Sequence, residues 1–197
     1  PSESLLLADA TADPHRLGLD LVNEAEHGTD SAALVATDSP ALAAALVGEV
    51  EAQVAALPEP RRSYATAVLG DLGGVLLFDA MADVIAFANE YAAEHVQVAT
   101  ADPEATLRRL RYAGEMLLGQ DTPIGASSYS IGIPATLPTG GFAKLNGGVT
   151  ARTFQTTTSI ARLSPEALAG LARPTTALAD HEGFPAHANA FRGRGLG

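Results

Sequence analysis

The stretch that decides the fold is 81–98, MADVIAFANEYAAEHVQV, in which an amphipathic helix runs directly into a strand. Apolar residues recur at helical spacing over 84–88. Polar and apolar side chains then alternate over 95–98, which is typical of a short strand. Glu94 and His95 are therefore predicted to stand side by side where a helix gives way to a strand.

Strands and helices alternate in the same way from residue 4 to residue 118. Apolar segments predict strands over 4–8, 33–36, 75–78, 95–98 and 114–118. Helices are predicted between them, over 14–27, 40–57, 61–69, 81–93 and 103–110. This order predicts an α/β fold with a parallel or mixed sheet and helices on both faces.

The regular pattern stops over 122–148, which carries three Pro and six Gly. A long irregular segment in a compact domain is usually functional. Beyond it the sequence predicts a short helix and strand, and then three helices, over 149–163, 165–171, 174–181 and within 183–197. We therefore predict an α/β domain over 1–148 and a C-terminal helical tail domain over 149–197.

Composition excludes several classes of partner. A net charge of −11 argues against nucleic acid and against an anionic membrane surface, since both attract clustered Lys and Arg. Without Cys there is neither a disulfide nor a thiolate zinc site. No apolar run reaches the ~20 residues of a transmembrane helix and no signal peptide is evident, so we expect a cytoplasmic protein. The chain opens without Met on a buried strand, which predicts that it is part of a longer polypeptide.

Glu94 and His95 form the first candidate site. An adjacent carboxylate and imidazole supply two proton acceptors of different basicity at one spot. The pair is equally consistent with a solvated Glu beside a His that stabilises the end of the preceding helix.

Three further side chains could bind a metal ion. Glu24 and His27 lie three residues apart and share a helical face, where a carboxylate and an imidazole can hold one ion. They could also be a surface pair. His187 stands among small apolar residues and could be a buried, hydrogen-bonded histidine. His15 and His181 are predicted at the surface.

Six motifs, in order along the chain, resemble those of the histidinol dehydrogenase family. The most diagnostic is NEYAAEH at 89–95, which resembles the family's NxYAPEH. The others are PSESL at 1–5 (family GPSEV), NEAEHG at 23–28 (QAEHG), LG and TP at 118–123 (LGxxTPE), LPTGG at 137–141 (LPTSG), and EG and AH at 182–187 (EGLxAH). The resemblance covers nearly all of this chain and the C-terminal part of a typical member, a little under half of it. It implies an incomplete Rossmann-like layered sheet with a small C-terminal helical appendage.

The resemblance also implies a reaction, related to histidine biosynthesis. Members of the family oxidise a primary alcohol to an aldehyde and then to a carboxylate with two NAD, and a zinc ion orients the substrate. Carried over, His95 takes the alcohol proton and Glu94 activates the water that attacks the aldehyde.

The family's zinc positions fall on Glu24, His27, Ser128 and His187. Here Glu replaces a Gln and Ser replaces an Asp, so the summed ligand charge is unchanged. We expect zinc to bind through Glu24, His27 and His187, with Ser128 or water completing the shell. The alternative is that the metal is lost and these side chains bind the substrate directly.

The substrate positions are partly changed. Ala135 stands where the family has a His that helps to hold its substrate, and losing this polar partner argues against L-histidinol and favours another small polar (amino) alcohol. The implied substrate-binding residues are Ser2, Glu24, His27, His95, Ser128, Glu182 and His187.

The resemblance places the main NAD contacts in an N-terminal half that this chain lacks, so no residue here is assigned to NAD. Family members are dimers, and the segment bearing Glu182 and His187 reaches into the partner's site. We therefore expect a homodimer with a shared active site. A different hypothesis is a non-catalytic partial chain that serves as a binding or assembly module, although the presence of both Glu94 and His95 favours catalysis.

Overall fold

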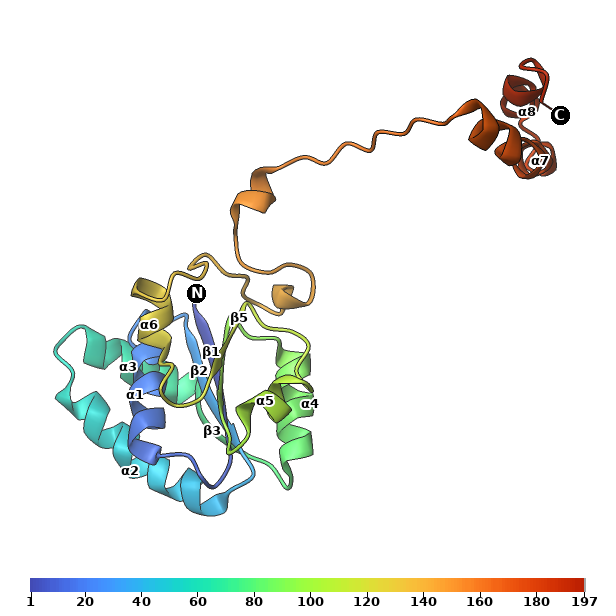
Figure 1. Cartoon of the computed structure of the whole chain (residues 1–197). Coiled ribbons are helices and arrows are strands. Elements are labelled where there is room, and N and C mark those ends of the chain that lie inside the picture. Colours follow the sequence, from blue (N-terminus) through green and yellow to red (C-terminus); the bar gives the residue numbers. More distant parts are fainter. Residues whose placement is uncertain (197) are drawn as a thin grey trace. The chain divides into compact units, whose positions relative to one another are not determined.

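The computed structural model describes residues 1–196 and divides the chain into two units (Figure 1). The first unit, Pro1–Phe154, contains all strands of the described residues. The second begins at Gln155 and contains the helices α7 (Pro165–His181) and α8 (Pro185–Arg192). No helix in the described part of the chain is long and apolar enough to cross a membrane.

The first unit is built on a five-stranded sheet in the order β3-β2-β1-β4-β5, and every neighbouring pair is parallel. The strands are β1 (Glu3–Ala8), β2 (Ala32–Thr37), β3 (Gly73–Leu77), β4 (His95–Ala99) and β5 (Glu115–Leu118). Leu5 lies opposite Leu34 of β2 and Val96 of β4. The predicted α/β class is confirmed, and the sheet is parallel rather than mixed.

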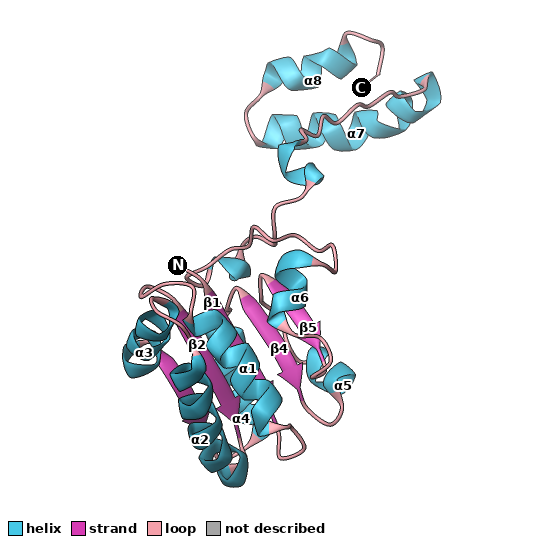
Figure 2. Cartoon of the chain, turned by 90° about the vertical axis from the view of Figure 1, so that its left-hand side faces the viewer, coloured by secondary structure: helices cyan, strands magenta, loops and turns pink. Residues whose placement is uncertain are grey.

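Helices cover both faces of the sheet, as Figures 1 and 2 show. The helices are α1 (Pro14–Ala25), α2 (Pro40–Ala56), α3 (Arg61–Asp71), α4 (Met81–Tyr91) and α5 (Pro103–Leu107). Alternate side chains of β1 enter two cores: Leu6 and Ala8 pack with α1, α2 and α3, whereas Leu5 and Leu7 pack with α4. Burying apolar surface on both faces is what a parallel sheet requires.

The junction between α4 and β4 has the geometry that positions Glu94. The helix ends at Tyr91, and Ala92 takes a left-handed conformation with φ of 53°. Its N–H still bonds to the carbonyl of Ala88 at 2.9 Å, so the chain turns at once without fraying. Ala92 is fully buried, and after Ala93 and Glu94 the chain enters β4 at His95.

Several predicted boundaries were wrong. Strand β3 includes Gly73 and Gly74 and ends before Phe78. A Cβ on Gly73 would lie 2.9 Å from the carbonyl oxygen of Ala33, so only glycine allows this close approach of β2. Helix α5 ends at Leu107 and not at residue 110.

The segment predicted as irregular contains a helix, α6 (Ile124–Tyr129), and a 3-10 turn, Phe142–Lys144. The side chain of Asp20 accepts a hydrogen bond of 3.1 Å from the N–H of Ile124, which holds the start of α6 against α1. This contact spans more than a hundred residues, and local sequence patterns do not report it.

The segment from residue 149 onward also differs from expectation. The predicted helix and strand over 149–163 are a 3-10 turn, Ala151–Phe154, with no strand in the described residues. Two predicted helices form one helix, α7, which continues through Pro174. Packing of α7 on α8 buries Ala172, Thr176 and Ala179, and this tertiary contact maintains the helix across the proline.

Candidate active site

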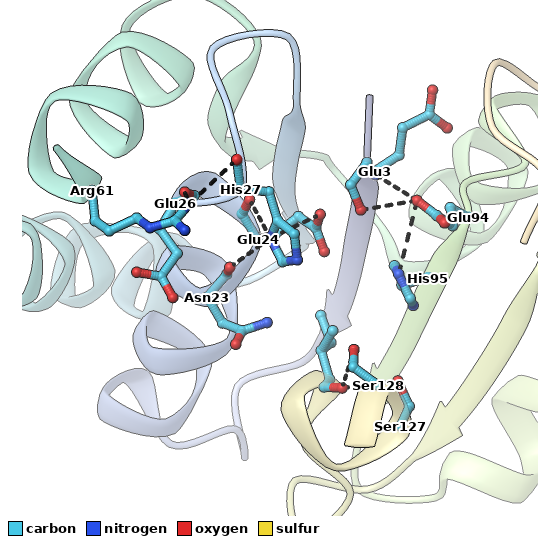
Figure 3. Close-up of polar contacts among 12 residues, drawn as sticks. Glu3, Asn23, Glu24, Glu26, His27, Arg61, Glu94, His95, Ser127 and Ser128 are labelled. Carbon is cyan, nitrogen blue, oxygen red and sulfur yellow. Dashed lines mark hydrogen bonds and ion pairs between the residues drawn. The ribbon is translucent and has the colours of Figure 1, made fainter. Parts of the chain in front are cut away.

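The candidate residues of the first unit gather at one edge of the sheet, the one formed by the amino-terminal ends of its strands (Figure 3). Parallel strands all begin at the same edge, so the residues that open β1, β4 and β5 are neighbours. Ser4 lies opposite His95, and His95 lies opposite Glu115. Helix α1 packs against β1 and carries Glu24 in its last turn, at this edge.

Glu94 is bound to the start of β1. Its Oε2 accepts hydrogen bonds of 3.0 Å from the Ser2 hydroxyl and 3.0 Å from the Glu3 N–H. The same oxygen lies 3.8 Å from Nε2 of His95. Glu94 and His95 are each only 8% exposed, so the interpretation of Glu94 as a solvated helix-end carboxylate was wrong.

His95 is anchored through its other ring nitrogen. Its Nδ1 lies 2.6 Å from Oε1 of Glu115, and the hydroxyl of Ser127 also donates to this oxygen at 2.6 Å. Burial by itself lowers the pKa of His95, but the hydrogen bond to Glu115 and the charges of Glu24, Glu94 and Glu115 together raise it. Within the described residues, Nε2 of His95 makes no hydrogen bond.

Glu24 is a buried carboxylate without hydrogen-bond partners. Its side chain is fully buried, and neither oxygen has a partner within the described residues. Burial raises its pKa, and the nearby Ser2 hydroxyl and His27 only partly counteract this. The interpretation of Glu24 and His27 as a surface pair was therefore wrong for Glu24, whereas His27 is exposed.

His27 is held through one ring nitrogen, Nδ1. Its Nδ1 donates to the carbonyl of Asn23 at 3.0 Å and lies 3.7 Å from Oε1 of Glu24. His27 and Ser128 line the same cavity, of about 190 Å³. The Ser128 hydroxyl donates only a long bond of 3.4 Å, to the carbonyl of Ile124.

The remaining predicted residues lie in the second unit or at the surface. Glu182 follows α7, and His187 lies in α8 with its ring 5.3 Å from that of Phe184. His187 is exposed, so the alternative of a buried histidine was wrong; its place and that of Glu182 at the site stay predictions. His15 and His181 are exposed, as expected.

Comparison with known proteins decides the family. The sequence model described as "Histidinol dehydrogenase" matches residues 1–195. The chain belongs to the histidinol dehydrogenase family. It is 46% identical to a histidinol dehydrogenase of Synechocystis over 98% of this chain and 45% of that protein, and 39% identical to a "histidinol dehydrogenase homolog" of Ruegeria pomeroyi over 95% and 43%.

The fold is shared as well. A crystal structure of histidinol dehydrogenase from Elizabethkingia anophelis matches with a TM-score of 0.91 at 32% identity, over 96% of this chain and 43% of that one. The chain thus spans a little under half the length of the relatives it matches and corresponds to the C-terminal part of this oxidoreductase family.

Two residues at the site were missed at the level of sequence, Glu115 and Ser127. A charged residue that opens an apolar strand is a signal that could have found Glu115. The contact between Glu115 and His95 depends on β5 lying next to β4, and the strand order cannot be read from the sequence.

Glu24 and His27 have the chemistry of metal ligands, but they do not form a complete metal site. A fully buried carboxylate without partners suits a metal ligand, and a ligating His typically donates its other N–H to a carbonyl, as His27 does. No three His, Asp or Glu side chains of the described residues are arranged to hold a metal ion. A metal ion bound to Glu24 and His27 would therefore need further ligands from elsewhere.

Proposed function

We propose that this chain supplies the proton-transfer groups for NAD-dependent oxidation of a small primary alcohol, through the aldehyde, to the carboxylate. The observation that carries the proposal is the buried pair of Glu94 and His95, in which Nε2 of His95 has no hydrogen-bond partner within the described residues. Membership of the histidinol dehydrogenase family supports the same class of reaction.

The two oxidations require two proton acceptors. In the first, Nε2 of neutral His95 accepts the hydroxyl proton while a hydride leaves the carbon. In the second, Glu94 accepts a proton from the water that adds to the aldehyde carbon. His95 has by then released its first proton to solvent, and its Nε2 accepts the hydroxyl proton of the hydrate while the second hydride leaves. NAD, when bound, accepts the hydride in each oxidation, so one alcohol consumes two NAD and one water.

Glu24 and His27 are proposed as zinc ligands, joined by His187 and by Ser128 or water. Zinc, when bound, holds and polarises the substrate oxygen. The complete burial of Glu24 supports this role, because an ionised carboxylate without partners is costly unless it binds a cation. The alternative, direct binding of the substrate by these side chains, predicts full activity after the metal has been removed.

The substrate is proposed to be a small polar alcohol other than L-histidinol. Ala135 offers no polar group for an imidazole ring, whereas the carboxylates of Glu24 and Glu94 suit a substrate that carries an amino group. Steady-state assays with histidinol beside other amino and hydroxy alcohols test this choice. Efficient turnover of histidinol would contradict it.

The reaction is tested by following NADH absorbance with a panel of primary alcohols. The chain is assayed alone and together with the polypeptide that corresponds to the N-terminal half of its relatives. We expect NADH in the second arm, with two NADH formed for each alcohol consumed. His95→Ala should abolish the signal, whereas His15→Ala, at an exposed histidine that pairs with Glu49, should not.

Absence of NADH with every alcohol in both arms would overturn the proposal. That outcome would favour the other hypothesis, in which the chain is a binding or assembly module. Loss of activity in both the His95 and the His15 variants would indicate a general effect on the fold rather than loss of the base.

A further inference from the structure

Glu115 holds His95 from the neighbouring strand. Because His95 and Glu115 lie opposite each other in β4 and β5, their side chains leave the sheet on the same face. Nδ1 of His95 lies 2.6 Å from Oε1 of Glu115, and the two side chains are only 10% and 7% exposed. A contact this short and this protected from water fixes the orientation of the ring.

Glu115 is itself fixed. The Ser127 hydroxyl, in α6, lies 2.6 Å from the same oxygen and 2.8 Å from the carbonyl of Ile124. Both partners of Ser127 are acceptors, so its single proton is directed to one of them, and the carboxylate is the nearer. An ionised carboxylate only accepts hydrogen bonds, so the proton between Glu115 and His95 belongs to Nδ1.

This arrangement determines which nitrogen of His95 can act as the base. With the proton on Nδ1, neutral His95 has its lone pair on Nε2, the nitrogen that faces Glu94 at 3.8 Å. With the proton on Nε2, the ring could not accept a proton at that position. A carboxylate that sets the tautomer of a histidine base is a recurrent device in catalysis.

We propose that Glu115 is a positioning residue, which holds His95 with its proton on Nδ1 so that Nε2 is the proton acceptor of the reaction. The role in turnover rests on the function proposed above, whereas the tautomer does not. The competing explanation is structural only: Glu115 neutralises a buried imidazole and contributes to folding without affecting the reaction.

The tautomer is measured first, on the full chain, by two-bond ¹H–¹⁵N NMR of the histidine rings above the pKa of His95. We expect the Nδ1–H form in the wild type and its loss in Glu115→Ala. His27 is an internal reference, because its Nδ1 is bonded to a backbone carbonyl and should not respond. An Nε2–H form of His95 in the wild type, or a tautomer unchanged in Glu115→Ala, would overturn the proposal whether or not the protein turns over an alcohol.

Kinetics then separate positioning from folding. In the assay with the N-terminal half, Glu115→Ala should lower kcat about 10- to 100-fold with KM nearly unchanged, and Ser127→Ala about 2- to 10-fold. Glu115→Gln, which keeps an acceptor but not the charge, should retain more activity than Glu115→Ala and reach half-maximal rate at a lower pH than the wild type. The matched control is Glu104→Gln, at an exposed glutamate in the first turn of α5, with no expected change.

The outcomes are distinguishable. If Glu115→Ala unfolds, Ser127→Ala and Glu115→Gln still carry the test. A fall in kcat with an unmoved pH profile in Glu115→Gln would support the structural explanation and refute positioning. The expected tautomer without turnover by any form of the protein would refute the proposed function and leave Glu115 as the group that sets the tautomer of His95.

Discussion

Glu24→Gln tests whether the Glu24 carboxylate binds a cation or instead stabilises the folded protein. The side chain is fully buried and its two oxygens have no partner within the described residues. A buried acceptor without a partner costs about 1–3 kcal/mol, and more when it is charged. His27 offsets little of this cost, because its side chain is 47% exposed and Nδ1 already donates to Asn23. The neutral, similarly shaped Gln should therefore raise the unfolding free energy of the metal-free protein by about 1–2 kcal/mol.

With zinc present, the wild type is expected to be more stable than Glu24→Gln. A ligand at 100 times its Kd stabilises the native state by about 2.7 kcal/mol, and the variant lacks the charged ligand that Glu24 provides. The assay is thermal unfolding of both proteins after treatment with a chelator and again with added zinc. For a chain of this size each kcal/mol corresponds to about 2–4 °C in Tm, so the gain without metal and the reversal with zinc are both measurable.

Asp20→Asn is the matched control. Asp20 is also a buried acid, but its oxygens accept hydrogen bonds of 2.8 Å from Gln97 and 3.1 Å from the Ile124 N–H. An amide cannot accept at both positions, so this variant should lose stability whether or not zinc is present. The reasoning about Glu24 is refuted if Glu24→Gln is less stable than the wild type without metal and responds to zinc as the wild type does.

Four further predictions can each be tested separately. Burial raises the pKa of Asp20 in the folded protein above its ordinary value of 3.8, despite its two hydrogen bonds. The free energy of unfolding of the wild type should therefore fall as the pH rises from 3.8 through the folded-state pKa. Urea unfolding of Asp20→Asn at the same pH values should lack this fall. Glu94→Gln should stop the reaction at the aldehyde, measured as one NADH per alcohol and trapped aldehyde. Gly73→Ala should cost about 1–3 kcal/mol through its contact with Ala33, whereas Gly70→Ala, which meets nothing within 4 Å, should be neutral or slightly stabilising in urea unfolding. Light scattering should report a homodimer, and a monomer at assay concentration would contradict the shared site.

The elements of the α/β unit were predictable because local signals agree with the tertiary structure. The Asp13 side chain accepts from the His15 N–H and Ser39 from the Leu42 N–H, with a proline at the first position of each helix, as the sequence indicates. The strands were found from their apolar runs. What failed were elements that depend on distant contacts: α6, held by Asp20, and α7, which continues through Pro174 because α8 packs on it.

In the site, too, the contacts between residues close in sequence were predictable and the contacts between distant residues were not. Glu94 and His95 are adjacent in sequence, and Glu24 and His27 share one helix, so spacing was enough to pair them. The contact between His95 and Glu115 requires the strand order, because alternation of helices and strands does not tell which strands are neighbours. Complete burial of Glu24 was also invisible, since the residues that cover it come from other elements.

The location of the site has an electrostatic consequence. Ligands of open α/β sheets usually bind at the carboxyl ends of the strands, where helices begin and their N-termini favour phosphate groups. Here Glu94, Glu115 and Glu24 meet at the amino edge, where α1 and α4 end. Helix C-termini carry partial negative charge, and three carboxylates add to it.

This edge therefore suits a cation, whether a metal ion, a substrate ammonium group or the imidazolium that His95 becomes after accepting a proton. The raised pKa of His95 is one expression of the same field. A dinucleotide pyrophosphate carries the opposite charge and would be repelled by it. We therefore expect the phosphates of NAD to be held away from this edge, by groups outside the proton-transfer pair, while the nicotinamide ring, which is positively charged before it accepts the hydride, is the part that approaches His95.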